Sequence, residues 1–333
     1  MRFFTSASRR RPSSLHTVLA SWILLGAAVP LQASAHGPPS QFLESIRSRI
    51  SGLIAQHHGV VGLAVVDPVN GDSFSIMGDE EFPSASLVKL GVMVDAFARV
   101  REGSLSLNDP LTLLALDQTG GSGVLQFLST PRELTIWDAV FLMVTLSDNT
   151  ATNLLLEKLR PRQVTERMRS LGLEHTRIFL PVNANAGESF DPEASRAFGL
   201  GVTTPVEIAA LLTMLYRGEL VDAEASEKML GIMTRQFYRE GIPRELPPEV
   251  AVAHKTGSLD RARNDCGVVY GPSRDFVICV MTKENEDQTW TYDNEAERLI
   301  AAISREVYEA LNPETGRVGD GVTRHPVPGS GYR

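Results

Sequence analysis

Hydrophobic positions follow two different periods along the chain, and these divide it into strand-forming ends and a helical middle. Residues 41–57 carry apolar side chains at helical spacing, which predicts an amphipathic helix. Two short apolar runs at 60–66 and 73–77 are separated by turn residues, so we expect two strands there. The pattern is helical from Ser86 to about residue 217. Its clearest helical runs are residues 137–146, 150–159, 163–171 and 205–216.

Strand-like runs return only near the C-terminus. Residues 250–256 predict one strand, residues 264–270 and 276–282 predict a hairpin, and a helix closes the pattern at about 294–311. Strands at both ends of a helical middle indicate a mixed sheet built from both termini. The fold class is therefore α/β (α+β), with helices flanking the sheet and an all-helical lobe inserted into the chain.

This layout divides the chain into parts with different expected structures. The expected parts are an export signal at 1–35, an α/β lobe formed by 36–83 and 205–311, a helical lobe at 84–204 and a disordered tail at 312–333. The tail is rich in Gly and Pro and poor in large apolar residues, so it has few side chains that could be buried in a core.

The first 35 residues have the three regions of a secretory signal peptide. Arg2 and the Arg9–Arg11 cluster precede an apolar run at 18–29, and Ala33-Ser34-Ala35 provides small residues for cleavage after Ala35. The apolar run is short for a permanent anchor, so we expect no stable membrane span after cleavage. The mature protein is then periplasmic or secreted, by the general or the twin-arginine route.

The charge and the histidine spacing exclude some classes of partner and cofactor. The four arginines of the signal leave with it, so the formal net charge falls from −8 to −12, which argues against nucleic acid or an anionic membrane as the main partner. The histidines show no metal-ligand spacing, so no metal or other cofactor is expected.

Cys266 and Cys279 lie opposite each other if the hairpin pairs Tyr270 with Asp275. A disulfide is conceivable, but two buried free thiols are favoured, because cross-strand bridges are often strained.

The best candidate for chemistry is Ser86-Leu87-Val88-Lys89, where a proline-containing loop becomes an apolar helix. Positions i and i+3 share a helix face, so the amine of Lys89 can reach the hydroxyl of Ser86. An apolar setting lowers the pKa of a lysine, and the neutral amine can then take the proton of a serine nucleophile. Only five of the 32 basic residues are lysines, which makes one on an apolar helix conspicuous.

Two further polar stretches follow at positions that this layout brings towards Ser86. Ser147-Asp148-Asn149 interrupts an apolar helix, and taken alone it is a helix break with an N-cap. Lys255-Thr256-Gly257-Ser258 ends a strand. A hydroxyl beside a lysine can bind a carboxylate, and the glycine that follows lets a ligand approach the backbone. This combination suits an extended substrate with a carboxylate.

These three motifs, in this order and these contexts, resemble those of the class A β-lactamases and penicillin-binding proteins. The likeness covers roughly residues 40–311, and it implies a serine hydrolase that cleaves a C–N amide bond through an acyl-enzyme and can confer antibiotic resistance. The implied catalytic residues are Ser86 as nucleophile, Lys89 as its base or as the positive charge that tunes the site, Ser147 as proton relay, and Lys255. Asn149 would hold the acyl amide, and Asp148 would fix its loop.

The resemblance also implies a substrate-binding set on the closing strand. Lys255, Thr256, Gly257 and Ser258 would surround the substrate carboxylate, and the backbone N–H groups of Ser86 and Ser258 would form the oxyanion hole. Arg261 or Arg263 could assist with the carboxylate, with Arg263 preferred. Gly120 to Leu125 resembles a loop at the cleft entrance.

One departure from the class A pattern bears on the reaction. Those enzymes carry a Glu-x-x-x-Asn element whose glutamate positions the deacylating water, whereas residues 176–186 contain no acid. Val182 or Asn183 takes the glutamate's place, and neither can act as a base. Glu188, Asp191 and Glu193 follow nearby. General-base help is worth about 100- to 10,000-fold, so release of the acyl-enzyme should be slow unless Lys89 or Ser147 assists.

Three functions therefore remain open. The first is an exported β-lactamase-like hydrolase of β-lactams or related amides and esters, with a non-standard deacylation. The second is a D-Ala-D-Ala carboxypeptidase or transpeptidase of the penicillin-binding type, acting on cell-wall peptides. The third is an acylation sensor or a non-catalytic module that binds cell-wall fragments. In each case the partner is a small molecule or a peptide, and we expect a monomer.

Overall fold

The computed structural model describes residues 41–313, so the expected export signal and nearly all of the expected tail lie outside the described part. Its centre is a five-stranded sheet in the order β2-β1-β10-β9-β8. The strands of this sheet are β1 (Val60–Val66), β2 (Ser73–Ile76), β8 (Ala251–Leu259), β9 (Ala262–Tyr270) and β10 (Phe276–Lys283).

The two ends of the described chain meet in this sheet. Strand β1 pairs with β10 from Val60 opposite Lys283 to Val66 opposite Val277. The sheet built from both termini is therefore confirmed, and all of its pairings are antiparallel. Both faces are buried, which explains why β1 and β10 are apolar along almost their whole length rather than alternating.

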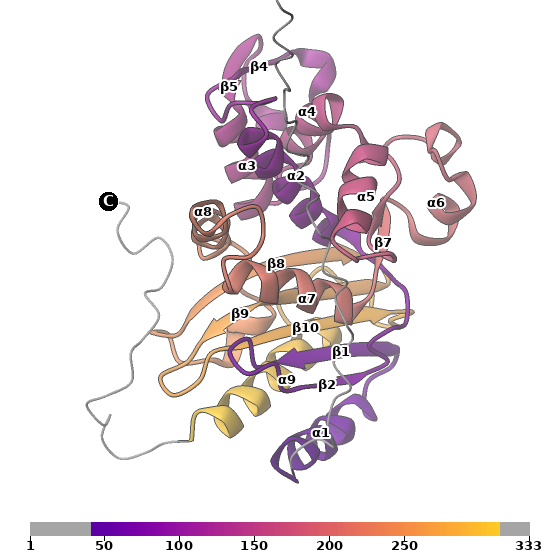
Figure 1. Cartoon of the computed structure of the whole chain (residues 1–333). Coiled ribbons are helices and arrows are strands. Elements are labelled where there is room, and N and C mark those ends of the chain that lie inside the picture. Colours follow the sequence, from indigo (N-terminus) through magenta and orange to yellow (C-terminus); the bar gives the residue numbers. More distant parts are fainter. Residues whose placement is uncertain (1–40, 314–333) are drawn as a thin grey trace, which may run out of the picture. The chain divides into compact units, whose positions relative to one another are not determined.

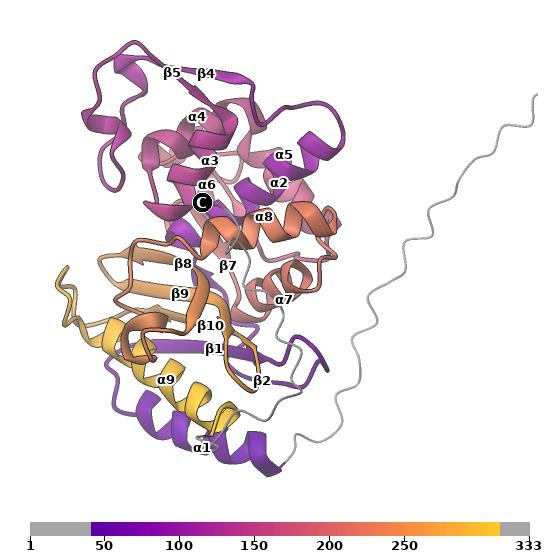
Figure 2. The same cartoon turned by 90° about the vertical axis from the view of Figure 1, so that its left-hand side faces the viewer.

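Helices cover both faces of the sheet (Figures 1 and 2). Helices α1 (Gln41–Ile54) and α9 (Glu295–Leu311) pack on one face and enclose a core that includes Ile50, Ile278 and Ile303. Helices α7 (Pro205–Tyr216) and α8 (Ala223–Met233) contact the other face. No helix among residues 41–313 is long and apolar enough to span a bilayer.

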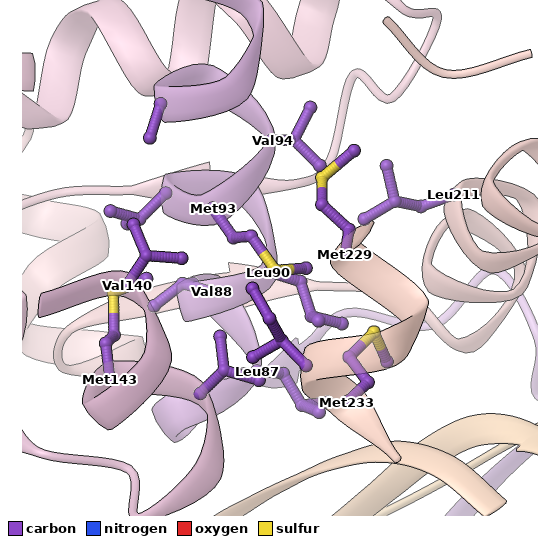
Figure 3. Packing of buried hydrophobic residues seen from close by; sticks show 14 of the residues in the cluster. Leu87, Val88, Leu90, Met93, Val94, Val140, Met143, Leu211, Met229 and Met233 are labelled. Carbon is purple, nitrogen blue, oxygen red and sulfur yellow. The ribbon is translucent and has the colours of Figure 1, made fainter. Parts of the chain in front are cut away.

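The helical lobe packs above α7 and α8. Its helices are α2 (Lys89–Arg101), α3 (Ile136–Thr145), α4 (Asn149–Leu159), α5 (Pro161–Ser170) and α6 (Pro192–Phe198). Helix α2 lies in the middle of the lobe, and it is buried from Lys89 to Ala98. Figure 3 shows Met93 of α2 among Val140, Met143 and Met229 from α3 and α8, so a single core joins the lobe to the sheet.

Short strands lie within and just before the expected helical middle. The pair β4 (Pro110–Leu113) and β5 (Arg132–Thr135), and a small sheet of β3 (Phe82–Pro83), β7 (Gly201–Thr203) and β6 (Arg177–Ile178), were not predicted. Each has at most four residues, so its sequence carries no usable period, and its pairing depends on distant segments. Helix α8 was also missed. The 3₁₀ turns are η1 (Ala85–Val88), η2 (Ala115–Asp117), η3 (Leu125–Phe127), η4 (Ala186–Glu188) and η5 (Ile242–Glu245).

The hairpin of β9 and β10 has the expected register, with Cys266 directly opposite Cys279. The preference for two free thiols was wrong, because the two sulfurs form a disulfide of 2.12 Å. The physical reason is their direct opposition, which leaves the Cα atoms only 3.9 Å apart on neighbouring strands.

Candidate active site

Ser86 lies where the chain passes from strand β3 into the buried helix α2. Ala85 adopts a left-handed backbone with φ of 46°, and this turn starts the 3₁₀ segment that carries Ser86. Because Ser84 N donates to Gly201 O at 3.0 Å, the approach to the turn is fixed to β7. The half-buried Ser86 lines a cavity of about 770 Å³ between the helical lobe and the end of β8.

Several of the residues named from sequence line this same cavity. They are Ser86, Ser147, Asn149, Thr256, Ser258 and Arg263. Lys89 and Lys255 are completely buried, and both contact Ser147. The fold thus brings three stretches that are far apart in sequence to one site.

Lys89 points across the site to the loop before α4. Its Nζ donates to Ser147 O at 2.6 Å, to Ser147 Oγ at 3.1 Å and to Asn149 Oδ1 at 2.9 Å. The direct hydrogen bond to Ser86 that the i,i+3 spacing predicted is not among the contacts of Lys89 in the described chain, because its Nζ is directed to these three oxygens instead. Burial, and then the nearby charge of Lys255, hold the pKa of Lys89 well below its usual value of 10.5.

Ser147 joins the two lysines. Lys255 Nζ donates to Ser147 Oγ at 3.1 Å and to Thr256 O at 2.8 Å, so both amines share one hydroxyl. Burial lowers the pKa of Lys255 to about 7. Ser147 is held in a left-handed conformation with φ of 52°, an uncommon geometry for a serine. A hydroxyl placed between two amines that readily lose a proton is suited to proton transfer.

Asp148 fixes the loop opposite Ser147. Its Oδ2 accepts from Val124 N at 2.6 Å and Leu125 N at 2.9 Å, and its Oδ1 caps α4 by accepting from Ala151 N at 2.9 Å. Asn149 Nδ2 donates to Gly120 O at 3.0 Å. The loop at 120–125 is therefore a fixed wall of the cavity.

The end of β8 packs directly against the turn that carries Ser86. A Cβ on Gly257 would lie 2.7 Å from Ser84 O and 3.1 Å from Ser86 N, so only glycine permits this contact. Asn264 on β9 adds a buried link, because its Nδ2 donates to Pro83 O at 2.9 Å. We missed Asn264 in the sequence, although a polar residue inside a buried strand was a usable signal.

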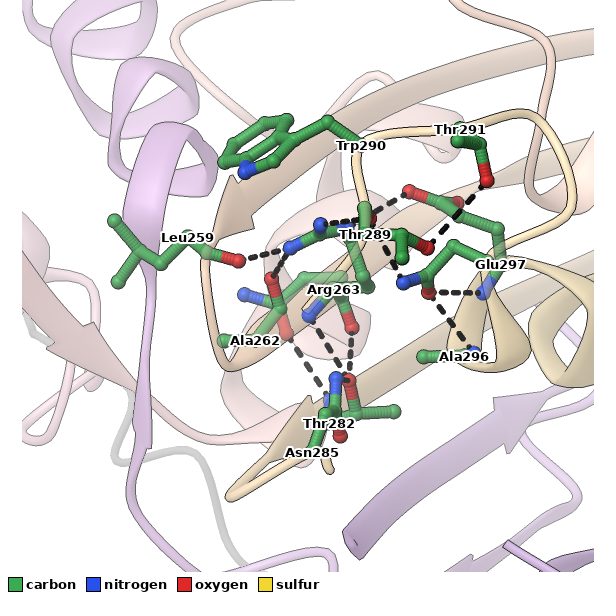
Figure 4. A network of polar contacts seen from close by, with 12 residues as sticks. Leu259, Ala262, Arg263, Thr282, Asn285, Thr289, Trp290, Thr291, Ala296 and Glu297 are labelled. Atoms are coloured by element: carbon green, nitrogen blue, oxygen red, sulfur yellow. Dashed lines mark hydrogen bonds and ion pairs between the residues drawn. The ribbon is translucent and has the colours of Figure 1, made fainter. Parts of the chain in front are cut away.

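The two candidate arginines differ in position, and Figure 4 shows the surroundings of Arg263. Arg261 is exposed, donates to Glu284 O at 3.2 Å and is not among the cavity residues. Arg263 is only 2% exposed and lines the cavity. It donates to the carbonyls of Leu259, Ala262 and Thr289, the last at 2.8 Å.

The wall without a glutamate is formed by residues 180–184 and 186. Asn153 on α4 clamps Val182 from both sides, because Val182 N donates to Asn153 Oδ1 at 2.8 Å and Asn153 Nδ2 donates to Val182 O at 3.1 Å. Neither Glu188 nor the two acids after it line the cavity. Glu240 and Glu297, which the sequence did not single out, do line it. Burial raises the pKa of Glu297 to about 7.

The described residues contain no group of three or more His, Cys, Asp or Glu side chains that could hold a metal ion. The side chains at this site that suit acyl transfer are serine hydroxyls and two lysines with lowered pKa values.

Comparisons with known proteins cover most of the chain. A family model described as the Beta-lactamase enzyme family matches residues 45–311. A β-lactamase of Streptomyces fradiae is 28% identical over 302 residues, which cover 86% of this chain and 94% of the relative. The crystal structure of a β-lactamase from Sphaerobacter thermophilus superposes with a TM-score of 0.71 at 30% identity, covering 80% of this chain and 97% of that one. A mutant of PBP-A, solved as an acyl-enzyme complex with penicillin G, gives a TM-score of 0.71 at 28% identity and covers 82% and 98%.

Proposed function

Because the chain belongs to the beta-lactamase enzyme family and is a serine hydrolase acting on β-lactam amide bonds, we propose that Ser86 is its nucleophile and that the acyl-enzyme is released without the class A glutamate. The observation that carries this proposal is the buried Lys89, whose pKa is lowered and whose amine contacts Ser147 in the cavity that Ser86 also lines. In this proposal the mature protein is a periplasmic or secreted monomer.

The proposed acylation uses the two lysines in different roles. The oxygen of Ser86 attacks the amide carbonyl, and its proton passes to the neutral amine of Lys89 when the hydroxyl turns towards it. Ser147 then gives its proton to the leaving nitrogen and regains one from a lysine amine. Lys255, Thr256 and Ser258 hold the substrate carboxylate, whose charge favours the protonated form of Lys255. The N–H groups of Ser86 and Ser258 stabilise the oxyanion.

The proposed deacylation is slow because the wall opposite Ser86 lacks a base. Val182 is half-buried and clamped at the place where an acid would act, and it supplies only an apolar side chain. Two alternatives therefore stay open. A D-Ala-D-Ala carboxypeptidase or transpeptidase tolerates slow release of β-lactams, and the likeness to PBP-A supports it. A sensor would keep its acyl group.

A chromogenic cephalosporin separates these functions. Continuous product over many equivalents supports a β-lactamase, whereas a burst of about one equivalent that then stalls supports a peptidase or a sensor. In the latter case, release of D-Ala from a D-Ala-D-Ala peptide identifies the peptidase. The Ser86→Ala variant is the control and should give neither burst nor product. A normal burst from that variant would refute Ser86 as nucleophile.

The deacylation proposal has its own test in Val182→Glu, with Asn183→Glu as matched control. Asn183 is exposed, has φ of 61° and directs its amide to Gly120 O, so it is not clamped by Asn153. We expect Val182→Glu to speed release of the acyl group by about 100-fold or more, and Asn183→Glu to change it little. Equal rates for all three proteins would contradict this assignment.

A further inference from the structure

Two aromatic side chains beside the cavity are exposed and yet contact charged side chains. Trp290 and Tyr292 lie between β10 and α9, are 66% and 57% exposed, and both line the cavity. Exposed aromatic rings leave apolar area in water, and that area contributes no burial energy to folding.

An arginine supports each ring. The guanidinium of Arg263 lies 4.4 Å from the ring centre of Trp290, and that of Arg244 lies 4.0 Å from the ring centre of Tyr292. The indole N–H of Trp290 donates to Asp260 Oδ1 at 3.0 Å. Trp290 is therefore restrained at one face and at its edge.

Arg263 uses its guanidinium mainly for hydrogen bonds to the backbone. As Figure 4 shows, its guanidinium reaches backbone carbonyls on both sides: those of Leu259 and Ala262 at the β8–β9 turn, and that of Thr289 next to Trp290. The carboxylate of Glu297 is 3.7 Å from its Nε. Because most N–H groups of Arg263 point to these acceptors, few remain for a substrate carboxylate. Its hydrogen bonds instead hold the segment that carries Trp290.

We propose that Trp290, with Leu259 and Tyr292, forms an apolar subsite for an aromatic group next to the substrate carboxylate, and that Arg263 is its positioning residue. Leu259 directly follows Ser258, so this subsite adjoins the residues assigned to the carboxylate. In a cephalosporin, the group at C3 is attached next to the carbon that bears the carboxylate. The inference rests on the proposed function of Ser86 and adds a substrate preference to it.

The experiment measures acylation of Ser86 by two cephalosporins with the same acyl side chain, one with an aromatic group at C3 and one with methyl. Acylation is followed by intact-protein mass, so slow release does not interfere. We expect Trp290→Ala to lower the acylation efficiency for the aromatic compound about tenfold, through a higher half-saturating concentration, and to leave the methyl compound unchanged. Trp290→Phe keeps a ring and should retain most of the preference.

Arg263→Met tests the positioning role. Arg263→Met should reduce acylation by the aromatic compound but not by the methyl compound. Combined with Trp290→Ala, it should cause little further reduction in acylation. Equal losses for both compounds would instead show that Arg263 binds the carboxylate, which overturns its assignment. Since a buried arginine is hard to replace, Asp260→Ala provides a second variant at an exposed residue, with an expected loss of about threefold for the aromatic compound only.

The outcomes separate this inference from the function on which it rests. If neither cephalosporin acylates the wild-type protein, the proposed function fails first. If both acylate it and Trp290→Ala affects them equally or not at all, the subsite is refuted while Ser86 remains the nucleophile.

Discussion

Replacing Gly257 by alanine tests whether close contact between β8 and the Ser86 turn is needed for acylation. The added Cβ would lie 2.7, 3.0 and 3.1 Å from Ser84 O, Leu87 N and Ser86 N. All three are backbone atoms, so no side chain can rotate away, and the strand or the turn must shift. Overpacking of this kind costs about 1–3 kcal/mol. We therefore expect a melting temperature lower by about 3–10 °C.

The larger effect should be on chemistry, because the shift moves Ser86 N relative to Ser258 N. Loss of one oxyanion-hole donor typically costs about 100- to 1,000-fold, so we expect acylation by a cephalosporin to fall about 100-fold. Gly120→Ala is the matched control, since its Cβ would meet only Gln126 Oε1 at 4.0 Å. A Gly257→Ala protein that acylates within threefold of wild type would refute the reasoning.

Three further predictions concern stability. Because burial lowers the pKa of Lys255 to about 7 in the folded protein, the unfolded chain binds more protons between pH 7 and 10.5, and the free energy of unfolding should rise with pH there. Lys255→Met should flatten that rise in urea titrations at several pH values, and an unchanged slope would contradict it. Asp148→Ala leaves three backbone N–H groups without their carboxylate and should cost about 3 kcal/mol or more by urea denaturation. Replacing Cys266 and Cys279 together by alanine should cost about 3 kcal/mol by the same assay, because the unfolded loop is no longer closed.

Features set by local pattern were predictable from the sequence. Strand β1 was expected at residues 60–66 and is found there, and the register opposing Cys266 and Cys279 followed from one turn assignment. Whether these two cysteines are joined was misjudged, since that depends on the distance between two strands rather than on their sequence. The short strands β4 and β5 were missed because neither has a period to detect.

The same distinction applies within the candidate site. Its polar residues could be named, because each stands out against an apolar background in its own segment. The contacts between them could not, because they join segments far apart in the chain. Lys89 contacts Ser147, 58 positions away, rather than the serine one turn before it. The clamp of Asn153 on Val182 and the arginine-supported aromatic rings are likewise products of tertiary packing.

The pairing of β1 with β10 has a consequence for how the protein folds. These strands are separated by more than 200 residues, so the central sheet cannot be completed until almost the whole chain has been synthesised. Such high contact order slows folding and leaves the edge of β1 open to other partners in the meantime. Chains that terminate before β10 should therefore be aggregation-prone rather than partly active.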